Sequence, residues 1–357
     1  MSARRALFAL YPGTAALSHV ELLDAPTPVV RVGGELADGI AGLWFKRDDI
    51  SASAYGGNKV RKLEFTLGRA IDEKRKTVIT LGALGSNHVL ATAIHGAACG
   101  LEVHAILTPQ VATGYLAPNL AADLAAGATL HPVTRAENAP RAAAALRAEL
   151  RERDGVEPAV LPFGGTSAEA EAGFVSAALE LCAQVESGLL PEPDLVYVPL
   201  GSTGTAVGLA IGFAAAGVRT RVVGVRVIPA DVVSLEQLRE VAQGALTLLD
   251  WLDASFPTLR PEDLPLEVRE GFLGSGYAVP TKAGREAIEL AARAGIVLES
   301  TYTAKTLAAL LADARAGSLA GANVVFWNTY NSRPLTGSEA RAPGIPPEFA
   351  GFVIDDA

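Results

Sequence analysis

Apolar residues along the chain gather in short runs that alternate with longer segments of small or amphipathic character. Two stretches, 77–101 and 195–218, contain no Asp, Glu, Lys or Arg, and each is about as long as a membrane span. Glycines interrupt both stretches in the same way, because a β-branched run is followed by a Gly-rich turn and then by an Ala-rich segment. This order predicts a buried parallel strand, a loop and a covering helix, and it excludes a continuous span.

The same alternation continues through most of the chain. Strands are predicted at 78–81, 101–107, 128–133, 195–198, 221–227 and 323–327. Helices are predicted at 114–127, 140–153, 169–185, 232–252, 282–294 and 304–316. Alternating strands and helices indicate an α/β fold, here two open twisted α/β domains, with functional groups in the loops at the carboxyl ends of the strands. We expect Trp44, Trp251 and Trp327 in the core.

Composition narrows the kind of partner. The 357 residues are 50% hydrophobic and 19% charged, which is typical of a globular chain long enough for two domains. The net charge is -9, and no run of Lys and Arg exceeds three residues, so neither nucleic acid nor an anionic membrane is an expected partner. A small molecule is the default partner.

The two cysteines, Cys99 and Cys182, are far apart and form no C-x-x-C or Cys/His cluster. This pattern predicts that both are buried free thiols in a reducing compartment and that they form no metal site. The first ten residues lack the apolar stretch of a signal peptide, so a cytoplasmic protein is expected.

Lys59 is the first residue with unusual surroundings, in a chain with seven lysines and 23 arginines. It follows Gly56-Gly57-Asn58 and opens a predicted helix, with Arg61 and Lys62 in the first turn. Cations are unfavourable at a helix N-terminus unless an anionic ligand compensates, and they favour the neutral amine that condenses with an aldehyde. The alternative is an ordinary solvated helix start whose cations pair with nearby carboxylates (Asp48, Asp49 and Glu64).

The Gly-rich turn Gly201-Ser-Thr-Gly-Thr205 follows an apolar strand and offers hydroxyls and free N–H groups as neutral donors. This set suits a single monophosphate. The turn lacks the G-K-[ST] ending of a P-loop and the G-x-G-x-x-G pattern of dinucleotide sites. A non-catalytic phosphate- or nucleotide-binding α/β protein is therefore an alternative, and it would need no lysine at position 59.

Six motifs occur in an order that resembles a known family: Tyr55-Gly-Gly-Asn-Lys59-Val-Arg-Lys62-Leu-Glu64, Gly85-Ser-Asn-His88, Pro162-Phe-Gly-Gly-Thr-Ser167, Gly201-Ser-Thr-Gly-Thr205, Gly276-Tyr-Ala-Val-Pro-Thr281 and Tyr302-Thr-Ala-Lys305. The family is the D-cysteine desulfhydrase and 1-aminocyclopropane-1-carboxylate (ACC) deaminase group. Its members are pyridoxal 5'-phosphate (PLP) enzymes of fold type II, the tryptophan synthase β-like fold. The resemblance spans about 24–331.

This resemblance implies that Lys59 binds PLP covalently and later moves the Cα proton of the substrate. Asn87 would bond the pyridine 3-oxygen, and Ser86 would face the substrate on the side opposite Lys59. The phosphate would be held by Ser202, Thr203, Gly204, Thr205 and Lys62. An N-cap role for Ser86 alone is the structural alternative.

By the same resemblance, Tyr277 and Tyr302 line the substrate pocket, one of them exchanging a proton at the leaving-group atom. His88 is either a substrate contact or a neutral histidine at the edge of the core. Thr303 and Thr329 would lie near the pyridine nitrogen.

The chain departs from the family at two places. ACC deaminases carry a glutamate where Thr303 stands here, and a hydroxyl does not keep the pyridine nitrogen protonated as a carboxylate does. We therefore expect β-elimination, converting D-cysteine to pyruvate, sulfide and ammonia, in preference to ACC deamination. Tyr330 and Asn331 replace two glycines of the family, which leaves the exact substrate open.

The expected assembly is a homodimer acting on a small amino acid. A small domain is expected at 57–167, and a large PLP-binding domain at 1–56 plus 168–357, with the cofactor in the cleft between them.

Overall fold

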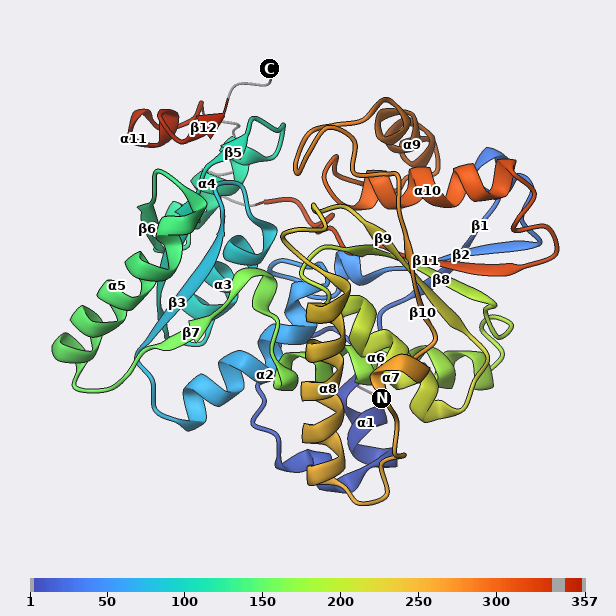
Figure 1. The fold of residues 1–357 in the computed structure, drawn as a ribbon, viewed down its shortest axis with the longest axis horizontal. Helices are drawn as coiled ribbons and strands as arrows, with labels where there is room; N and C mark the ends of the chain where they lie inside the picture. Colours follow the sequence, from blue (N-terminus) through green and yellow to red (C-terminus); the bar gives the residue numbers. More distant parts are fainter. Residues whose placement is uncertain (1–2, 336–343, 355–357) are drawn as a thin grey trace.

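The computed structural model describes residues 3–335 and 344–354 (Figure 1), and two open sheets organise them. The larger sheet has six strands in the order β1-β2-β11-β8-β9-β10, and only its edge pair β1/β2 is antiparallel. Its strands are β1 (Val29–Val32), β2 (Gly42–Lys46), β8 (Leu195–Leu200), β9 (Arg221–Arg226), β10 (Leu266–Arg269) and β11 (Asn323–Trp327).

The smaller sheet is entirely parallel, in the order β6-β4-β3-β7. Its strands are β3 (Thr77–Ala83), β4 (Glu102–Thr108), β6 (Thr129–Pro132) and β7 (Ala159–Leu161). A separate two-residue ladder joins β5 (Gln110–Val111) to β12 (Val353–Ile354). This ladder and the short helix α11 (Pro347–Ala350) place the C-terminal segment beside the smaller sheet (Figure 1).

Helices cover both faces of each sheet, which confirms the predicted fold class. On the larger sheet, one face carries α1 (Ala3–Leu10), α6 (Ala168–Glu186), α7 (Gly204–Ala216) and α8 (Leu235–Leu252). The other face carries α9 (Lys282–Arg293) and α10 (Thr303–Arg315). On the smaller sheet, α2 (Lys59–Asp72), α3 (Asn87–Ala98) and α4 (Leu116–Ala125) lie opposite α5 (Ala139–Asp154). Short 3-10 helices are η1 (Pro12–Ala16), η2 (Gly34–Ala37), η3 (Asp48–Ile50), η4 (Ala136–Asn138), η5 (Phe163–Gly165) and η6 (Pro261–Asp263).

The structure differs from the sequence predictions in three details. Helix α8 begins at Leu235 and not at Val232, because Ser234 and Gln237 form a capping box that fixes its first turn. Trp251 is 79% exposed, so its predicted place in the core is wrong, whereas Trp44 and Trp327 are buried. Both cysteines are free as expected but only partly buried. No helix within the described part of the chain has the length and apolar character that crossing a membrane requires.

Helices α6 and α7 pack against each other through glycines. A Cβ on Gly208 of α7 would lie 2.4 Å from Phe174 Cβ and 2.8 Å from the Glu171 carbonyl oxygen of α6. A Cβ on Gly212, one turn later, would lie 2.6 Å from the Val175 carbonyl oxygen. Real side chains do not tolerate such distances, so this contact requires glycine and fixes where α7 begins.

A buried polar network joins α2 to the larger sheet. Arg61 of α2 donates to both oxygens of Asp48, at 2.8 and 2.7 Å, and to Glu180 of α6 at 3.1 Å. Trp327 of β11 donates its indole N–H to Asp48 at 2.7 Å, and Lys46 of β2 pairs with Glu180. Each buried charge therefore has partners, as low dielectric surroundings demand.

Candidate active site

A cavity of about 660 Å³ lies where the loops of the two sheets face each other. Its walls come from the carboxyl ends of the parallel strands β3, β4, β8, β9 and β11 and from the first turns of α2, α3 and α7. Loops at this edge of α/β sheets are the usual place for ligands.

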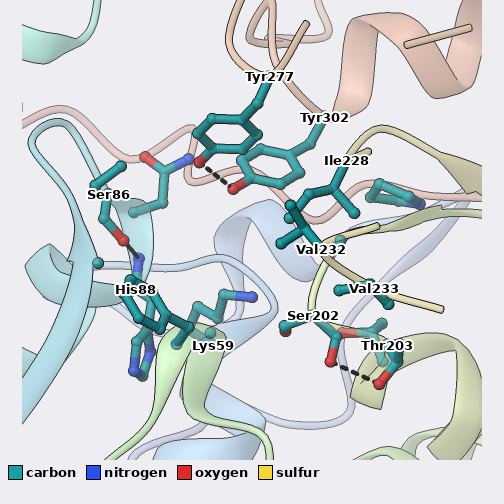
Figure 2. Close-up of a pocket in the computed structure, with 18 of the residues that line it drawn as sticks. Lys59, Ser86, His88, Ser202, Thr203, Ile228, Val232, Val233, Tyr277 and Tyr302 are labelled. Carbon is teal, nitrogen blue, oxygen red and sulfur yellow. Dashed lines mark hydrogen bonds between the residues drawn. The ribbon is translucent and has the colours of Figure 1, made fainter. Parts of the chain in front are cut away.

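Lys59 is the first residue of α2, and its side chain points into this cavity (Figure 2). Burial, and secondly the charge of Lys62, lowers the pKa of Lys59 to about 7. The preceding turn needs Gly57, whose φ is 94° and whose Cβ would lie 3.1 Å from the Thr329 carbonyl oxygen. The chain therefore presents an amine that is substantially neutral at physiological pH.

The turn between β8 and α7 forms a second wall. Thr203 has φ 68°, a left-handed conformation that is rare for a β-branched residue. The Gly204 N–H donates to the Ser202 carbonyl at 2.9 Å, and the N–H groups of Thr205 and Ala206 have no acceptor within α7. Ser202, Thr203 and Thr205 line this end of the cavity. Thr205 is oriented by Asn58, whose Nδ2 donates to its hydroxyl at 2.9 Å. A helix N-terminus with hydroxyls around it suits a phosphate.

Two residues predicted at the phosphate lie behind this turn and not in the cavity wall. Lys62 Nζ lies 3.3 Å from Glu171 Oε1 and donates to Thr166 Oγ1 at 3.1 Å. A Cβ on Gly204 would lie 1.7 Å from the same Glu171 oxygen. Lys62 and Gly204 are therefore placed to support the turn, with Glu171 balancing the charge of Lys62.

The smaller sheet supplies the opposite wall through the turn after β3. Ser86 caps α3, because its hydroxyl oxygen accepts N–H bonds from His88 at 3.2 Å and Val89 at 3.3 Å, and it also lines the cavity. Asn87 Oδ1 accepts a bond from Asn119 at 3.0 Å. His88 is buried, and burial holds its pKa well below the ordinary value. A neutral imidazole thus borders the cavity near Lys59 (Figure 2).

Tyr277 and Tyr302 form a hydroxyl pair, 2.6 Å apart, above Lys59 (Figure 2). Burial raises the pKa of both side chains, so both keep their protons at neutral pH. One hydroxyl donates to the other, and the hydrogen of the second stays free for a ligand.

The structure adds Glu299, which the sequence reasoning missed. Its carboxylate lines the cavity and accepts N–H bonds from Thr301, Tyr302 and Thr303 at the start of α10, at 2.6 to 2.8 Å. Thr303 is fully buried, and its hydroxyl bonds to the Glu299 backbone N–H at 2.9 Å, so Thr303 does not reach the cavity surface. The available signal was an acidic residue within one turn of the start of a helix, where a carboxylate is favoured.

The last wall comes from the turn after β11. Thr329 and Tyr330 line the cavity, and burial raises the pKa of Tyr330 to about 12. Asn331 does not line it, because its Oδ1 accepts the Gly56 N–H at 2.8 Å and ties this turn to the one before Lys59. Of the two residues that replace family glycines, Tyr330 adds bulk to the cavity lining and Asn331 does not.

These residues fit PLP. A partly neutral lysine amine suits an aldehyde, the start of α7 suits a phosphate, and Asn87 offers an amide for a ring oxygen. Among residues 3–335 and 344–354, no group of three or more His, Cys, Asp or Glu side chains is placed to hold a metal ion.

Comparison with known proteins agrees with this chemistry. Residues 20–329 match the family model described as pyridoxal-phosphate dependent enzyme. The chain is 37% identical over 350 residues to nocardicin C-9' epimerase of Nocardia uniformis subsp. tsuyamanensis, covering 95% of this chain and 99% of that protein. It is 34% identical over 303 residues to D-cysteine desulfhydrase of Salmonella schwarzengrund (strain CVM19633), covering 82% and 87%.

Solved structures show the same fold. A crystal structure of an ACC deaminase homologue superposes with a TM-score of 0.77 at 29% identity, covering 91% of this chain and 94% of that one. Threonine deaminase isoform 2 of Solanum lycopersicum shares the fold with a TM-score of 0.61 at 17% identity, covering 91% and 84%. The predicted fold, cofactor and enzyme class are thereby confirmed. The chain belongs to the family of pyridoxal-phosphate dependent enzymes.

Proposed function

We propose that this enzyme catalyses deaminating β-elimination on an amino acid, as a D-cysteine desulfhydrase does. The observation that carries the proposal is that one cavity is lined by Lys59, whose pKa is lowered to about 7, and by the hydrogen-bonded hydroxyls of Tyr277 and Tyr302. A base for the Cα proton and a proton donor for the leaving group are the two functions that elimination needs. When bound, PLP supplies the electron sink that makes the Cα proton acidic.

The residues of the chain divide the remaining work. Lys59 Nζ takes the Cα proton, which its neutral form can do near pH 7. Ser86 accepts two backbone N–H bonds, so its own hydrogen is free to donate to the substrate carboxylate, beside the N-terminus of α3.

The tyrosine pair acts at the β-carbon. As the C–S bond of D-cysteine breaks, the sulfur leaves with the electron pair of that bond. The resulting thiolate takes a proton from Tyr302, which Tyr277 supports by a 2.6 Å hydrogen bond. The proton that Lys59 removed restores the tyrosine through the pair. The organic product is 2-aminoacrylate, which water hydrolyses to pyruvate and ammonia, so D-cysteine and water give pyruvate, hydrogen sulfide and ammonia.

The test compares three substrates with the PLP-loaded enzyme. Pyruvate should form from D-cysteine and faster from β-chloro-D-alanine, whose leaving group departs without a proton, and little 2-oxobutanoate should form from ACC. Rapid ACC turnover would instead favour ACC deaminase, and this outcome now has a structural argument, because the Glu299 carboxylate lines the cavity. Absence of pyruvate from every β-substituted amino acid would overturn the proposal.

Epimerisation is a second candidate, favoured by the 37% identity to nocardicin C-9' epimerase over nearly the full length of both chains. Inversion at Cα needs a proton removed on one face and returned on the other, and Lys59 and Ser86 are two groups available in the cavity. Reaction in D₂O distinguishes epimerisation from elimination. Incorporation of deuterium at Cα with loss of optical activity and without release of pyruvate indicates an epimerase.

We further propose the individual roles predicted for those site residues that line the cavity, the domain division at 57–167, and a cytoplasmic homodimer. Two unpaired thiols support a reducing compartment, and closed dimers are the commonest assembly among soluble oligomers. Light scattering after gel filtration tests the dimer.

A further inference from the structure

The lining of the cavity also includes a mostly apolar section, which we call the apolar arm. It is formed by Phe163, Ile228, Pro229, Val232, Val233 and Val241. Figure 2 shows Ile228, Val232 and Val233 on the side of the cavity opposite Ser86 and His88. Two parts of the chain form the arm, and we call them its two banks. Phe163 comes from η5 after β7, and the other five residues come from the segment between β9 and α8 and from α8 itself.

Neither PLP nor a small polar amino acid accounts for this section. The polar groups suited to both lie around Lys59, Ser86, Ser202 and the tyrosine pair. Val232 is 53% exposed and Phe163 44% exposed, one on each bank of the cavity mouth. Exposed apolar side chains that line a cavity gain free energy when an apolar group covers them.

The larger bank has a fixed conformation. Val232 and Val233 both donate N–H bonds to the Pro229 carbonyl, at 3.1 and 3.2 Å. Arg226, which is buried, donates to the Val233 carbonyl at 2.6 Å and to Glu270 at 2.7 Å. The capping box of Ser234 then keeps these valines out of α8. The arm is thus formed before any ligand binds, which favours affinity.

Charge narrows the ligand further. Among the described residues that line the cavity, Lys59 is the one Lys or Arg side chain, and PLP would take it up. The outer end of the arm carries the Glu240 carboxylate and the Gln237 amide. A substituent that ends in a negative charge would find no partner there and would face Glu240.

We propose that the enzyme accepts amino acids whose β-substituent carries a bulky uncharged apolar group, such as an aryl or branched alkyl thioether, which fills the apolar arm. The inference rests on the proposed elimination and names its substrate class. Burial of an aryl group gains on the order of tenfold to a hundredfold in equilibrium, so a similar gain in kcat/KM over D-cysteine is expected.

The experiment measures pyruvate release by the PLP-loaded enzyme from D-cysteine, S-benzyl-D-cysteine and S-carboxymethyl-D-cysteine. The benzyl compound should exceed D-cysteine at least tenfold in kcat/KM, and the anionic carboxymethyl compound should fall below the benzyl compound by a similar factor. Val232→Asp should reduce the preference for benzyl over D-cysteine at least tenfold. Val160→Asp is the matched control, because Val160 is 43% exposed on β7 and does not line the cavity.

Calorimetric binding of D-phenylalanine and D-alanine gives a readout that does not depend on elimination. Pyruvate from D-cysteine with no preference for the benzyl compound, and equal affinities for the two amino acids, would overturn the inference while the elimination stands. No pyruvate from any compound, with D-phenylalanine binding at least tenfold tighter and Val232→Asp removing that advantage, would support the arm and overturn the elimination. No pyruvate and equal affinities would overturn both.

Discussion

Gly208→Ala tests whether the contact between α6 and α7 positions the phosphate-binding turn. The new Cβ would lie 2.4 Å from Phe174 Cβ and 2.8 Å from the Glu171 carbonyl oxygen, and the second of these is backbone that cannot rotate away. Helix α7 must therefore shift away from α6 by several tenths of an ångström or more. Overpacking of this kind costs about 1–3 kcal/mol.

The substitution also has a favourable part, because alanine is better than glycine in a helix interior by about 1 kcal/mol. Gly244→Ala measures that part alone, since Gly244 lies in α8 with no atom within 4 Å of its added Cβ. Relative to Gly244→Ala, we expect Gly208→Ala to lower the free energy of urea unfolding by about 1–3 kcal/mol. We also expect weaker PLP binding, because the same shift moves the first N–H groups of α7.

Fluorescence-monitored urea unfolding of the PLP-free proteins and spectroscopic titration with PLP check both expectations. If Gly208→Ala equals Gly244→Ala in stability and in PLP affinity, the close packing of α6 and α7 does not hold the turn in place, and the reasoning fails.

Three further predictions follow from the site and the core. Borohydride reduction of the PLP-loaded enzyme should leave the pyridoxyl group on Lys59 in a peptide map, and Lys59→Ala should abolish turnover; an adduct on Lys62 would contradict the assignment. The pKa of Lys59 is lowered from 10.5 to about 7, so the unfolded chain binds more protons than the folded one between these two pH values. The free energy of unfolding of the PLP-free protein should therefore rise with pH across this window more steeply than that of Lys59→Met. Equal slopes in pH-dependent urea unfolding would contradict the lowered pKa. Trp327→Phe removes the indole donor from buried Asp48, so urea unfolding should show a loss of about 1–3 kcal/mol, whereas Trp251→Phe on the surface should change little.

Much of the fold was predictable because the buried parallel strands carry a strong signal. The runs at 77–83 and 195–200 are apolar, are followed by glycine turns, and lie within stretches without formal charge, so strand, loop and helix could be placed from sequence. Strands β1 and β2 were not predicted, since β1 is a four-residue edge strand and β2 ends in a lysine whose charge is balanced only by residues far along the chain.

The site residues that lie in glycine-rich turns could be predicted from the sequence. Those whose position depends on packing between distant parts of the chain could not. Lys59, Ser86 and Thr203 were found from their glycine turns, and the structure brings them to one cavity. Glu299 was missed because its role arises from the hydrogen bonds that its carboxylate accepts from backbone N–H groups, and no sequence motif marks these bonds. The apolar arm was hidden because Val232 and Val233 continue the apolar pattern of the following helix, and only the capping box separates them from it.

The network around Arg61 also determines which parts of the site would travel together if the cleft opened. Helix α2 is tied by Arg61 to Asp48 and Glu180, which belong to the body of the larger sheet, although α2 precedes the smaller sheet in the chain. Lys59, two residues earlier on the same helix, is therefore tied to the larger sheet as well as to the smaller one, against which the apolar face of α2 packs. Ser86, Asn87 and His88 follow β3 of the smaller sheet, so a displacement of that sheet relative to the larger one would change their distances from Ser202, Thr203 and Thr205, and the two walls of the site would separate.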